Sequence, residues 1–305
     1  MGVWNMNRSL TATTRRRFIQ ATGAGMAGAA LVSPAGGANL RKKKVLFLTK
    51  SSGYEHSAIR RDEGALSHAE HVLIELGKKH GFDVEVTKDA SIFNGDLEPY
   101  AAFAFYTTGD LTTAGNDKNL PMSPSGKQAL LDAVHAGKGF IGFHCASDTF
   151  HSVGNANENQ DQKDPYIEML GGEFITHGRQ QPARMRVVDN AFPGMQTLQH
   201  GFTMNEEWYS LKNFAPDLHV LLVIETAGLD GRGYRRPPYP ATWVRHHGQG
   251  RVFYTAMGHR EDVWTNPAFQ SITVGGIRWA LGDVTADTSA NIGQVTPAAS
   301  QLPVP

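Results

Sequence analysis

The sequence has a single cysteine, Cys145, among 305 residues. One thiol excludes an internal disulfide and any CxxC metal site. Net charge is also missing, because Lys plus Arg and Asp plus Glu each number 29. No overall field therefore favours nucleic acid or a membrane surface as a partner. The chain also lacks HExxH-type metal spacing, and neither a Walker nor a GxGxxG pattern follows the first expected strand.

A long hydrophobic run is absent too. The apolar stretch at residues 21–32 is rich in Gly and Ala and too short for a permanent membrane anchor. It follows Thr-Arg-Arg-Arg-Phe-Ile at residues 14–19, which fits the twin-arginine pattern, and it precedes small-x-small sites at residues 33–38. We therefore predict that residues 1–38 are a twin-arginine signal segment and that the protein is exported, periplasmic or secreted, by the twin-arginine export machinery. The alternative is a basic tail on a cytosolic protein.

Behind this segment, short apolar runs alternate with amphipathic helical patterns. Strands are expected at residues 44–49, 82–87, 101–106, 139–144, 185–188, 220–224, 242–245 and 252–256. Helices are expected at about residues 65–81, 123–136 and 267–281. This alternation predicts an α/β fold over residues 39–284, with a doubly wound, mostly parallel sheet and helices on both faces. Residues 285–305 show no periodicity, which predicts a flexible C-terminal tail.

Polar residues gather where the expected strands end, and in doubly wound sheets the site lies beyond those carboxyl ends. The segments are Lys50–Ser57, His144–Phe150, Gly171–Gly178, Asn205–Tyr209 and Met257–Asp262. In order and spacing they resemble the ThuA (trehalose-utilisation) family, with its G-[FY]-x-H, G-x-H before D-T, G-G-x-F-x-x-H, E-W-Y and G-H motifs. The resemblance covers essentially all of residues 39–284. It implies the class I glutamine amidotransferase-like fold, which is flavodoxin-like, and an enzyme of sugar or glycoside utilisation.

The histidines and carboxylates of these segments are candidates for acid–base catalysis. Imidazole exchanges a proton near neutral pH, and a carboxylate orients it or acts as the partner acid or base. The catalytic candidates are His56, His144, Asp148, His177, Glu207 and His259, and the substrate-binding candidates are Tyr54, Glu55, Trp208 and Tyr209. The aromatic rings among them would supply a platform for a small carbohydrate. Nothing in the pattern indicates an oligomeric state.

The same residues leave two other functions open. His56, His144, His177 and His259 are candidate ligands for a divalent metal such as zinc, which needs three protein ligands in a catalytic site. No local spacing supports this, so the sequence predicts no cofactor firmly. The second alternative is a non-catalytic carbohydrate-binding or accessory protein that uses the same crevice, because one fold hosts many functions.

The implied fold also raises the possibility of a cysteine hydrolase. Its amidotransferase members carry the nucleophile at the centre of G-x-C-x-G and take the base from a later H-x-E. Here residues 142–146 read Gly-Phe-His-Cys-Ala, and His259-Arg260-Glu261 follows later. Alignment on the glycine puts His144 in the nucleophile position and Cys145 one residue beyond it. We therefore expect Cys145 to be a small buried residue, which disfavours glutamine hydrolysis.

Overall fold

The computed structural model describes Met1 and residues 42–304. The chain divides into two units, Met1–Leu40 and Arg41–Pro305. Apart from Met1, the predicted signal segment lies outside the described residues. Within residues 42–304, no helix combines the length and the hydropathy needed to cross a membrane.

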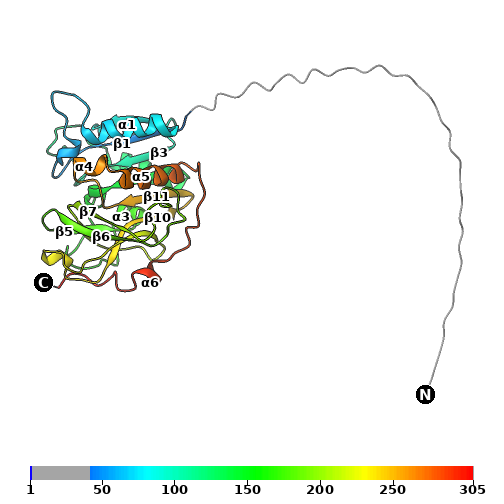
Figure 1. The fold of residues 1–305 in the computed structure, drawn as a ribbon. Helices are drawn as coiled ribbons and strands as arrows, with labels where there is room; N and C mark the ends of the chain where they lie inside the picture. The colour runs from blue at the N-terminus through cyan, green and yellow to red at the C-terminus, as the bar shows by residue number, and fades with distance from the viewer. Residues whose placement is uncertain (2–41, 305) are drawn as a thin grey trace, which may run out of the picture. The chain divides into compact units, whose positions relative to one another are not determined.

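A nine-stranded mixed sheet forms the centre of the second unit, in the order β2-β1-β3-β4-β11-β10-β9-β6-β7 (Figure 1). Its parallel half contains β1 (Lys44–Leu48), β2 (Asp83–Thr87), β3 (Ala102–Phe105), β4 (Gly139–Phe143) and β11 (Gly250–Thr255). Its antiparallel half continues through β10 (Tyr239–His247), β9 (His219–Ile224), β6 (Gln181–Val187) and β7 (Phe202–Glu206). A separate antiparallel pair is formed by β5 (Glu173–His177) and β8 (Tyr209–Lys212).

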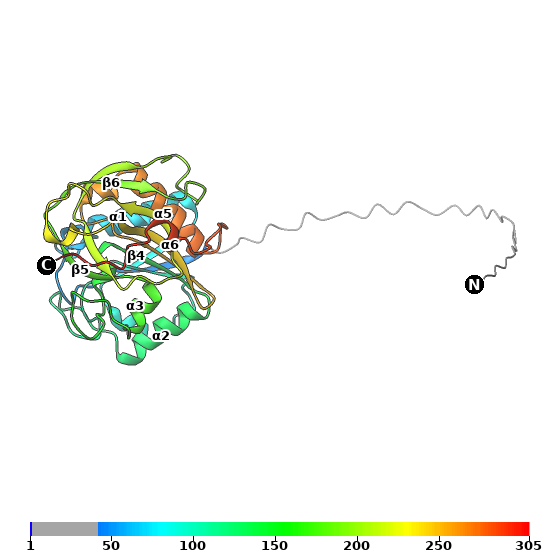
Figure 2. The ribbon, with the colours of Figure 1, turned by 90° about the horizontal axis from the view of Figure 1, so that it is seen from below.

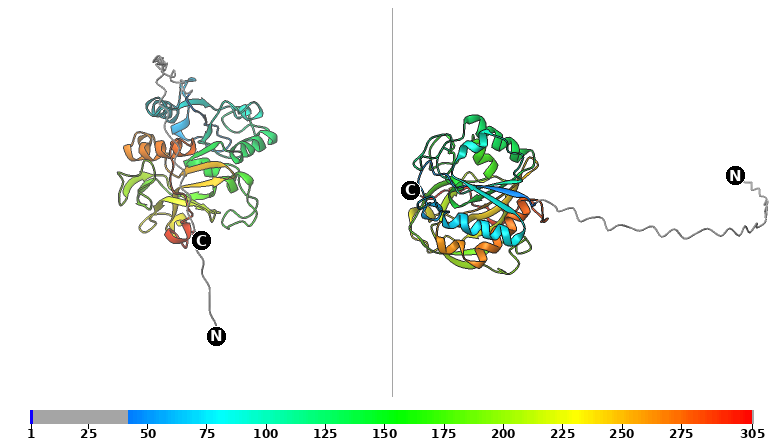
Figure 3. Two further views of the ribbon diagram at one scale, coloured as in Figure 1. Left: turned by 90° about the vertical axis from the view of Figure 1, so that its right-hand side faces the viewer. Right: turned by 90° about the horizontal axis from the view of Figure 1, so that it is seen from above.

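The central parallel strands β1, β3 and β4 are apolar because helices cover both of their faces. Every residue of β3 and β4 is buried, as are all but the first of β1. Figures 2 and 3 show α1 (His68–His80) and α5 (Pro267–Ala280) on one face, and α2 (Pro124–His135) and α3 (Pro165–Leu170) on the other. The predicted α/β fold with helices on both faces is confirmed.

The shorter helices are α4 (Glu261–Trp264), α6 (Ile292–Val295) and the 3-10 turns η1 (Ser57–Ile59), η2 (Ala90–Asn94), η3 (His144–Asp148) and η4 (Arg232–Tyr234).

Side-chain caps set the ends of the main helices. The hydroxyl of Ser67 accepts a hydrogen bond from the N–H of Glu70, whose carboxylate accepts one from the N–H of Ser67 in return. The first helix therefore begins at His68 rather than at Ala65, and it ends as predicted at Gly81, whose φ is 88°. Ser123 caps α2, which lies within the helix expected at residues 123–136.

Residues 285–304 pack against the sheet, in contrast to the flexible tail expected from the sequence. The side chain of Asn291 accepts a hydrogen bond from the N–H of Val220 in β9 and donates one to the carbonyl of the same residue. Further on, the guanidinium of Arg236 donates to the carbonyl of Ala299 at 2.7 Å. Single polar contacts and scattered apolar side chains such as Ile292 and Val295 hold this segment, so it carries no periodic pattern.

The order of strands places the switch point of the sheet between β1 and β3. The chain passes from β1 to β2 on one side and then to β3 on the other. The strands β1, β3, β4 and β11 run parallel, so their carboxyl ends share one edge. Four antiparallel pairings lead from β11 to β7, and β7 therefore points the same way as β11. Segments from both halves of the sheet thus leave it at this edge.

Candidate functional site

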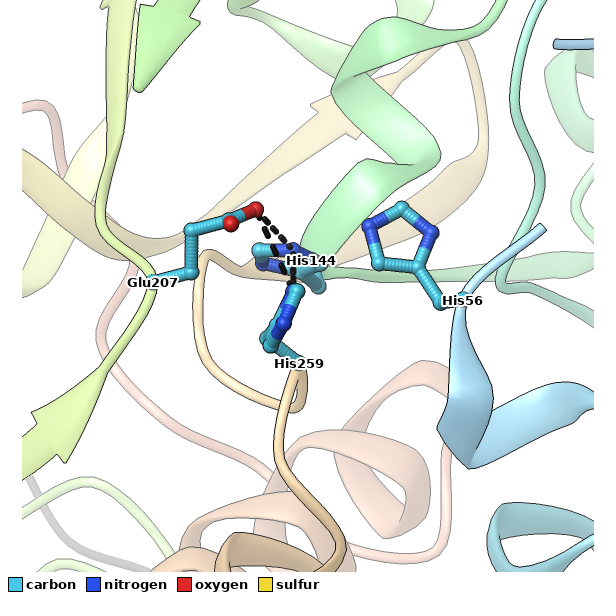
Figure 4. A group of neighbouring side chains, drawn as sticks. All are labelled: His56, His144, Glu207 and His259. Carbon is cyan, nitrogen blue, oxygen red and sulfur yellow. Dashed lines mark hydrogen bonds and ion pairs between the residues drawn. The ribbon is translucent and has the colours of Figure 1, made fainter. Parts of the chain in front are cut away.

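Four polar side chains from distant parts of the sequence meet at this edge, and we refer to them as the His/Glu cluster (Figure 4). They are His56 after β1, His144 after β4, Glu207 after β7 and His259 after β11. Each offers one nitrogen or oxygen atom, and these atoms all lie within 4.8 Å of one another. The structure therefore brings together four of the residues that the sequence marks as catalytic candidates.

His144 is fixed by an unusual backbone conformation and by one hydrogen bond. It opens η3 directly after β4 with a φ of 41°, a left-handed value that is rare outside glycine and is concentrated at functional sites. Its Nδ1 lies 2.9 Å from the carbonyl oxygen of Ala256, so Nδ1 carries the hydrogen and donates it. The lone pair of Nε2 therefore faces the cluster. Complete burial lowers the pKa of His144, which keeps the ring neutral.

Glu207 and His259 form the charged part of the cluster. Oε1 of Glu207 lies 3.2 Å from Nδ1 of His259 and 3.8 Å from Nε2 of His144, and these two nitrogens are 3.3 Å apart. Burial favours the neutral acid, but the two neighbouring histidines outweigh it and hold the pKa of Glu207 well below its usual range. Burial also opposes a proton on His259, yet the hydrogen bond to Glu207 leaves the pKa of His259 raised. A carboxylate thus faces an imidazole whose pKa is raised.

His56 is the most isolated member of the cluster. Its side chain is almost fully buried, and Nε2 lies 3.3 Å from the hydroxyl of Tyr209. Its Nδ1 is buried without a hydrogen-bond partner among the described residues. Burial first, and the nearby rings of His144 and His259 second, lower the pKa of His56 to about 2, so the ring is neutral. A buried, unpaired nitrogen indicates a place for a further polar partner or an ion.

Three other predicted residues border the cluster. Nδ1 of His177, at the end of β5, lies 3.3 Å from Oε2 of Glu207, and the side chain is 45% exposed. The buried ring of Tyr209 packs on His144 with centroids 4.1 Å apart. Tyr54 is 67% exposed, and its ring meets His56 edge-on at 5.0 Å. Tyr54 and His177 therefore mark the side from which solvent reaches the cluster.

Trp208 lies away from the cluster, contrary to its predicted role as a sugar platform. Its ring is fully buried, and its indole N–H donates to the carbonyl of Gln181 at 2.9 Å. Side chains alternate along an extended backbone, so a residue between Glu207 and Tyr209 points the opposite way, into the core. The tryptophan of this motif is a packing residue.

Asp148 and Glu55 also make their contacts elsewhere. Asp148 pairs with His151 at 2.9 Å, and this hydrogen bond, followed by that of Glu173, raises the pKa of His151 to about 9. Glu55 pairs with the buried Lys88 at 2.9 Å. Neither carboxylate joins the His/Glu cluster, because a basic side chain already holds each of them.

Two contributors to the site escape the sequence analysis, Glu206 and Gln180. Glu206 is fully buried, and Oε2 accepts hydrogen bonds from the N–H groups of Gly258 at 2.8 Å and His259 at 3.2 Å. Burial raises the pKa of Glu206 to about 7. The side-chain amide of Gln180 lies 2.9 Å from Nε2 of His259. The sequence holds one indication that Glu206 is buried: it is two residues from Met204, so both side chains lie on the inward face of β7.

Cys145 has no access to solvent and no position in the cluster. It is fully buried, and burial raises the pKa of its thiol well above the usual value. A catalytic cysteine needs a lowered pKa and a neighbouring base, whereas His259 faces His144 instead. The prediction of a buried cysteine is confirmed, and the geometry gives no support to a cysteine hydrolase.

Known proteins share this fold. The family model described as ThuA, trehalose utilisation, matches residues 44–280. A putative ThuA-like protein from Bacteroides uniformis superposes with a TM-score of 0.55 at 19% identity, over 84% of this chain and 95% of that one. A putative ThuA-like protein from Parabacteroides merdae superposes with a TM-score of 0.54 at 19% identity. The match covers 81% of this chain and 93% of that one. No curated protein sequence matches significantly. At such identities the two structures establish the fold, and because the family model spans most of the sequence, the chain belongs to the ThuA (trehalose-utilisation) family.

Proposed function

We propose that this protein is a carbohydrate-processing enzyme whose His/Glu cluster binds a divalent transition metal such as zinc. The observation that carries the proposal is the spacing of three donor atoms. Nε2 of His144, Nδ1 of His259 and Oε1 of Glu207 are 3.2, 3.3 and 3.8 Å apart. A tetrahedral zinc ion with ligands at about 2.1 Å has ligand-to-ligand separations of about 3.4 Å. The donors therefore have the spacing of a metal site.

The chemistry of the donors fits a metal as well as their spacing does. Zinc binds neutral imidazole, burial keeps His56 and His144 neutral, and zinc binding would release the proton from Nδ1 of His259. The Nδ1 hydrogen of His144 is held by a backbone carbonyl, the outer contact that metal-binding histidines usually make. Glu207 supplies one negative charge, and the unpaired Nδ1 of His56 offers a further donor. Imidazole and carboxylate together are the ligands of catalytic zinc sites.

A bound divalent metal supplies Lewis-acid polarisation of an oxygen atom. The protein itself supplies a proton acceptor beside it. Nδ1 of His177 lies 3.0 Å from the carbonyl of Gly178 and 3.3 Å from Glu207, so Nδ1 carries the hydrogen. Nε2 is then left to accept a proton from a substrate hydroxyl, and the exposure of His177 gives a substrate access to it.

A sugar or glycoside is the substrate class that these features favour. The description of the matching family, trehalose utilisation, supports a sugar substrate. The geometry of the site supports a sugar as well, because the exposed, amphipathic ring of Tyr54 at the entrance suits the apolar face of a sugar ring. In this proposal Tyr54 binds the sugar, His177 accepts the proton and Glu207 holds the metal.

Metal analysis and product analysis on one preparation test the proposal. We expect the dialysed protein to retain about one equivalent of metal and to convert trehalose, glucosides or their 3-keto forms, with conversion lost on chelation. Sugar binding without conversion would favour the non-catalytic carbohydrate-binding alternative. A protein that converts the sugar with no bound metal would leave acid–base chemistry by His177 and Glu207 as the mechanism.

We also propose export by the twin-arginine pathway, which rests on Arg15, Arg16 and the uncharged stretch at residues 21–32. Replacing both arginines with lysine keeps the charge but removes the pair that the export machinery recognises. We expect the double variant to stay in the cytoplasm. Its delivery across the inner membrane at the wild-type level would refute the proposal.

A further inference from the structure

Glu206 holds the backbone of two members of the His/Glu cluster. Oε2 accepts from the N–H of Gly258 and from that of His259, and Oε1 accepts from the N–H of Glu207 at 2.9 Å. Its side chain is fully buried. Three strands separate β7 from β11 in the sheet, so this carboxylate joins the edge strand to the turn that follows a central strand.

The turn that Glu206 reaches is held from its other side as well. The carbonyl of Gly258 accepts from the hydroxyl of Tyr106 at 2.9 Å and from the indole N–H of Trp264 at 2.7 Å. Gly258 has a φ of 119°, which side-chain-bearing residues rarely adopt. The N–H and the carbonyl of Gly258 are thus both hydrogen-bonded to buried side chains. These hydrogen bonds fix the direction in which the backbone continues to His259.

We propose that Glu206 is the positioning residue of the cluster, setting the separation of Glu207 and His259 and thereby the affinity of the site for metal. The part concerning metal affinity rests on the proposed function. The part concerning position does not, because the three hydrogen bonds exist without a metal.

Both carboxylate oxygens are needed for this task. Oε1 serves Glu207, and Oε2 serves Gly258 and His259. Glutamine has the same shape but only one acceptor oxygen. Whichever way its amide is turned, an NH2 group faces a backbone N–H of the cluster. Glu206→Gln should therefore break the hydrogen bonds either to Glu207 or to Gly258 and His259, while the side-chain volume stays the same.

The experiment compares E206Q with E70Q and with wild type. Glu70 is equally buried and also accepts a backbone N–H, that of Ser67, but it contacts no member of the cluster. Zinc affinity is measured by competition with a chelator. Hydrogen–deuterium exchange of the metal-free protein is measured on the peptide containing Gly258 and His259, and melting temperatures report the loss of stability in each variant.

We expect E206Q to bind zinc on the order of 10- to 100-fold more weakly than wild type, as for other residues that orient metal ligands. We also expect faster exchange at Gly258 and His259 in E206Q. E70Q should lower the melting temperature with wild-type zinc affinity and wild-type exchange at this turn. Unchanged zinc affinity in E206Q, or unchanged exchange at the turn, would overturn the proposal.

Two outcomes keep this inference separate from the proposed function. If wild type retains no zinc, the proposed function fails, and exchange at the turn alone decides the role of Glu206. If E206Q does not fold, residue-resolved exchange of the metal-free wild type tests the same contacts. Slow exchange at Gly258 and His259 then supports the role, and exchange at the rate of unprotected amides refutes it.

Discussion

The parallel and antiparallel halves of the sheet give the site different chemistry. The segments that follow strands β1, β4 and β11 of the parallel half carry His56, His144 and His259, which supply the imidazole nitrogens. Strand β7 of the antiparallel half ends beside Glu207, which supplies the negative charge. The central strands thus provide the imidazole donors, and the edge strand adds the carboxylate. A site divided in this way should respond differently to substitutions in the two halves.

The largest effect is expected in the parallel half. His144→Ala removes the donor whose orientation is fixed by the carbonyl of Ala256. We expect at least a 100-fold loss of zinc affinity and loss of turnover. His219→Ala is the matched control, because this buried histidine of the antiparallel half bonds Asp189 and Ser289 instead. Equal metal loss in both variants would show that the effect comes from destabilisation and not from a lost ligand.

Glu207→Gln removes the charge that the antiparallel half contributes. In the metal-free protein the lowered pKa of Glu207 adds stability above its unfolded value of about 4.3, which is lost as the pH falls. The raised pKa of His259 adds stability that is complete below about pH 6.5 and lost as the pH rises through its folded value. The pair therefore stabilises most between these two pH values.

We expect Glu207→Gln to lower the free energy of unfolding by about 2 kcal/mol near pH 5.5, as for a hydrogen bond to a charged group. The difference from wild type should shrink toward pH 8.5. Urea titrations of the metal-free proteins across this range measure it. A difference independent of pH would contradict the assignment of a charged pair.

The apolar runs and the helix caps made the parallel half predictable. β1, β3 and β4 are buried on both faces, so their sequences are continuous apolar runs, and Ser123 marks the start of α2 without ambiguity. Polar residues directly after such runs had to lie at one edge of a parallel sheet. This is why His56, His144 and His259 could be placed together from the sequence.

The rest depends on contacts that leave no periodic pattern. β5, β7 and β8 are short and mix polar with apolar residues, so they were not expected as strands. The burial of Trp208 follows from the local alternation of side chains, which a motif does not reveal. Asn291 and Arg236 hold the C-terminal segment through hydrogen bonds to distant residues. Such long-range partners become visible only in the folded chain.

An effect on stability alone is expected from the C-terminal segment, which contacts β6 and β9 of the antiparallel half and Asn159. Asn291→Ala leaves the N–H and the carbonyl of Val220 without their side-chain partner. We expect a loss of about 2 kcal/mol in the free energy of unfolding with unchanged zinc affinity. Gln294→Ala, on the exposed side of α6, is the control and should be nearly silent. A wild-type stability for Asn291→Ala would mean that the segment does not pack in solution.

The smallest effect is expected at Cys145, in the parallel half beside the cluster. Cys145→Ala deletes one buried sulfur atom, which should cost about 1 kcal/mol of stability. Turnover and zinc affinity should remain. A loss of turnover at unchanged melting temperature would restore the cysteine-hydrolase hypothesis, with His259 and Glu261 as its partners.

The central claim is that both halves of the sheet hold one metal ion between them. Anomalous scattering at the zinc edge, from crystals of the zinc-loaded protein, tests it most directly. We predict one strong peak about 2.0–2.2 Å from Nε2 of His144, Nδ1 of His259 and a carboxylate oxygen of Glu207, the usual zinc–ligand distances. A zinc peak bound without Glu207, or no peak within the His/Glu cluster, would contradict the account.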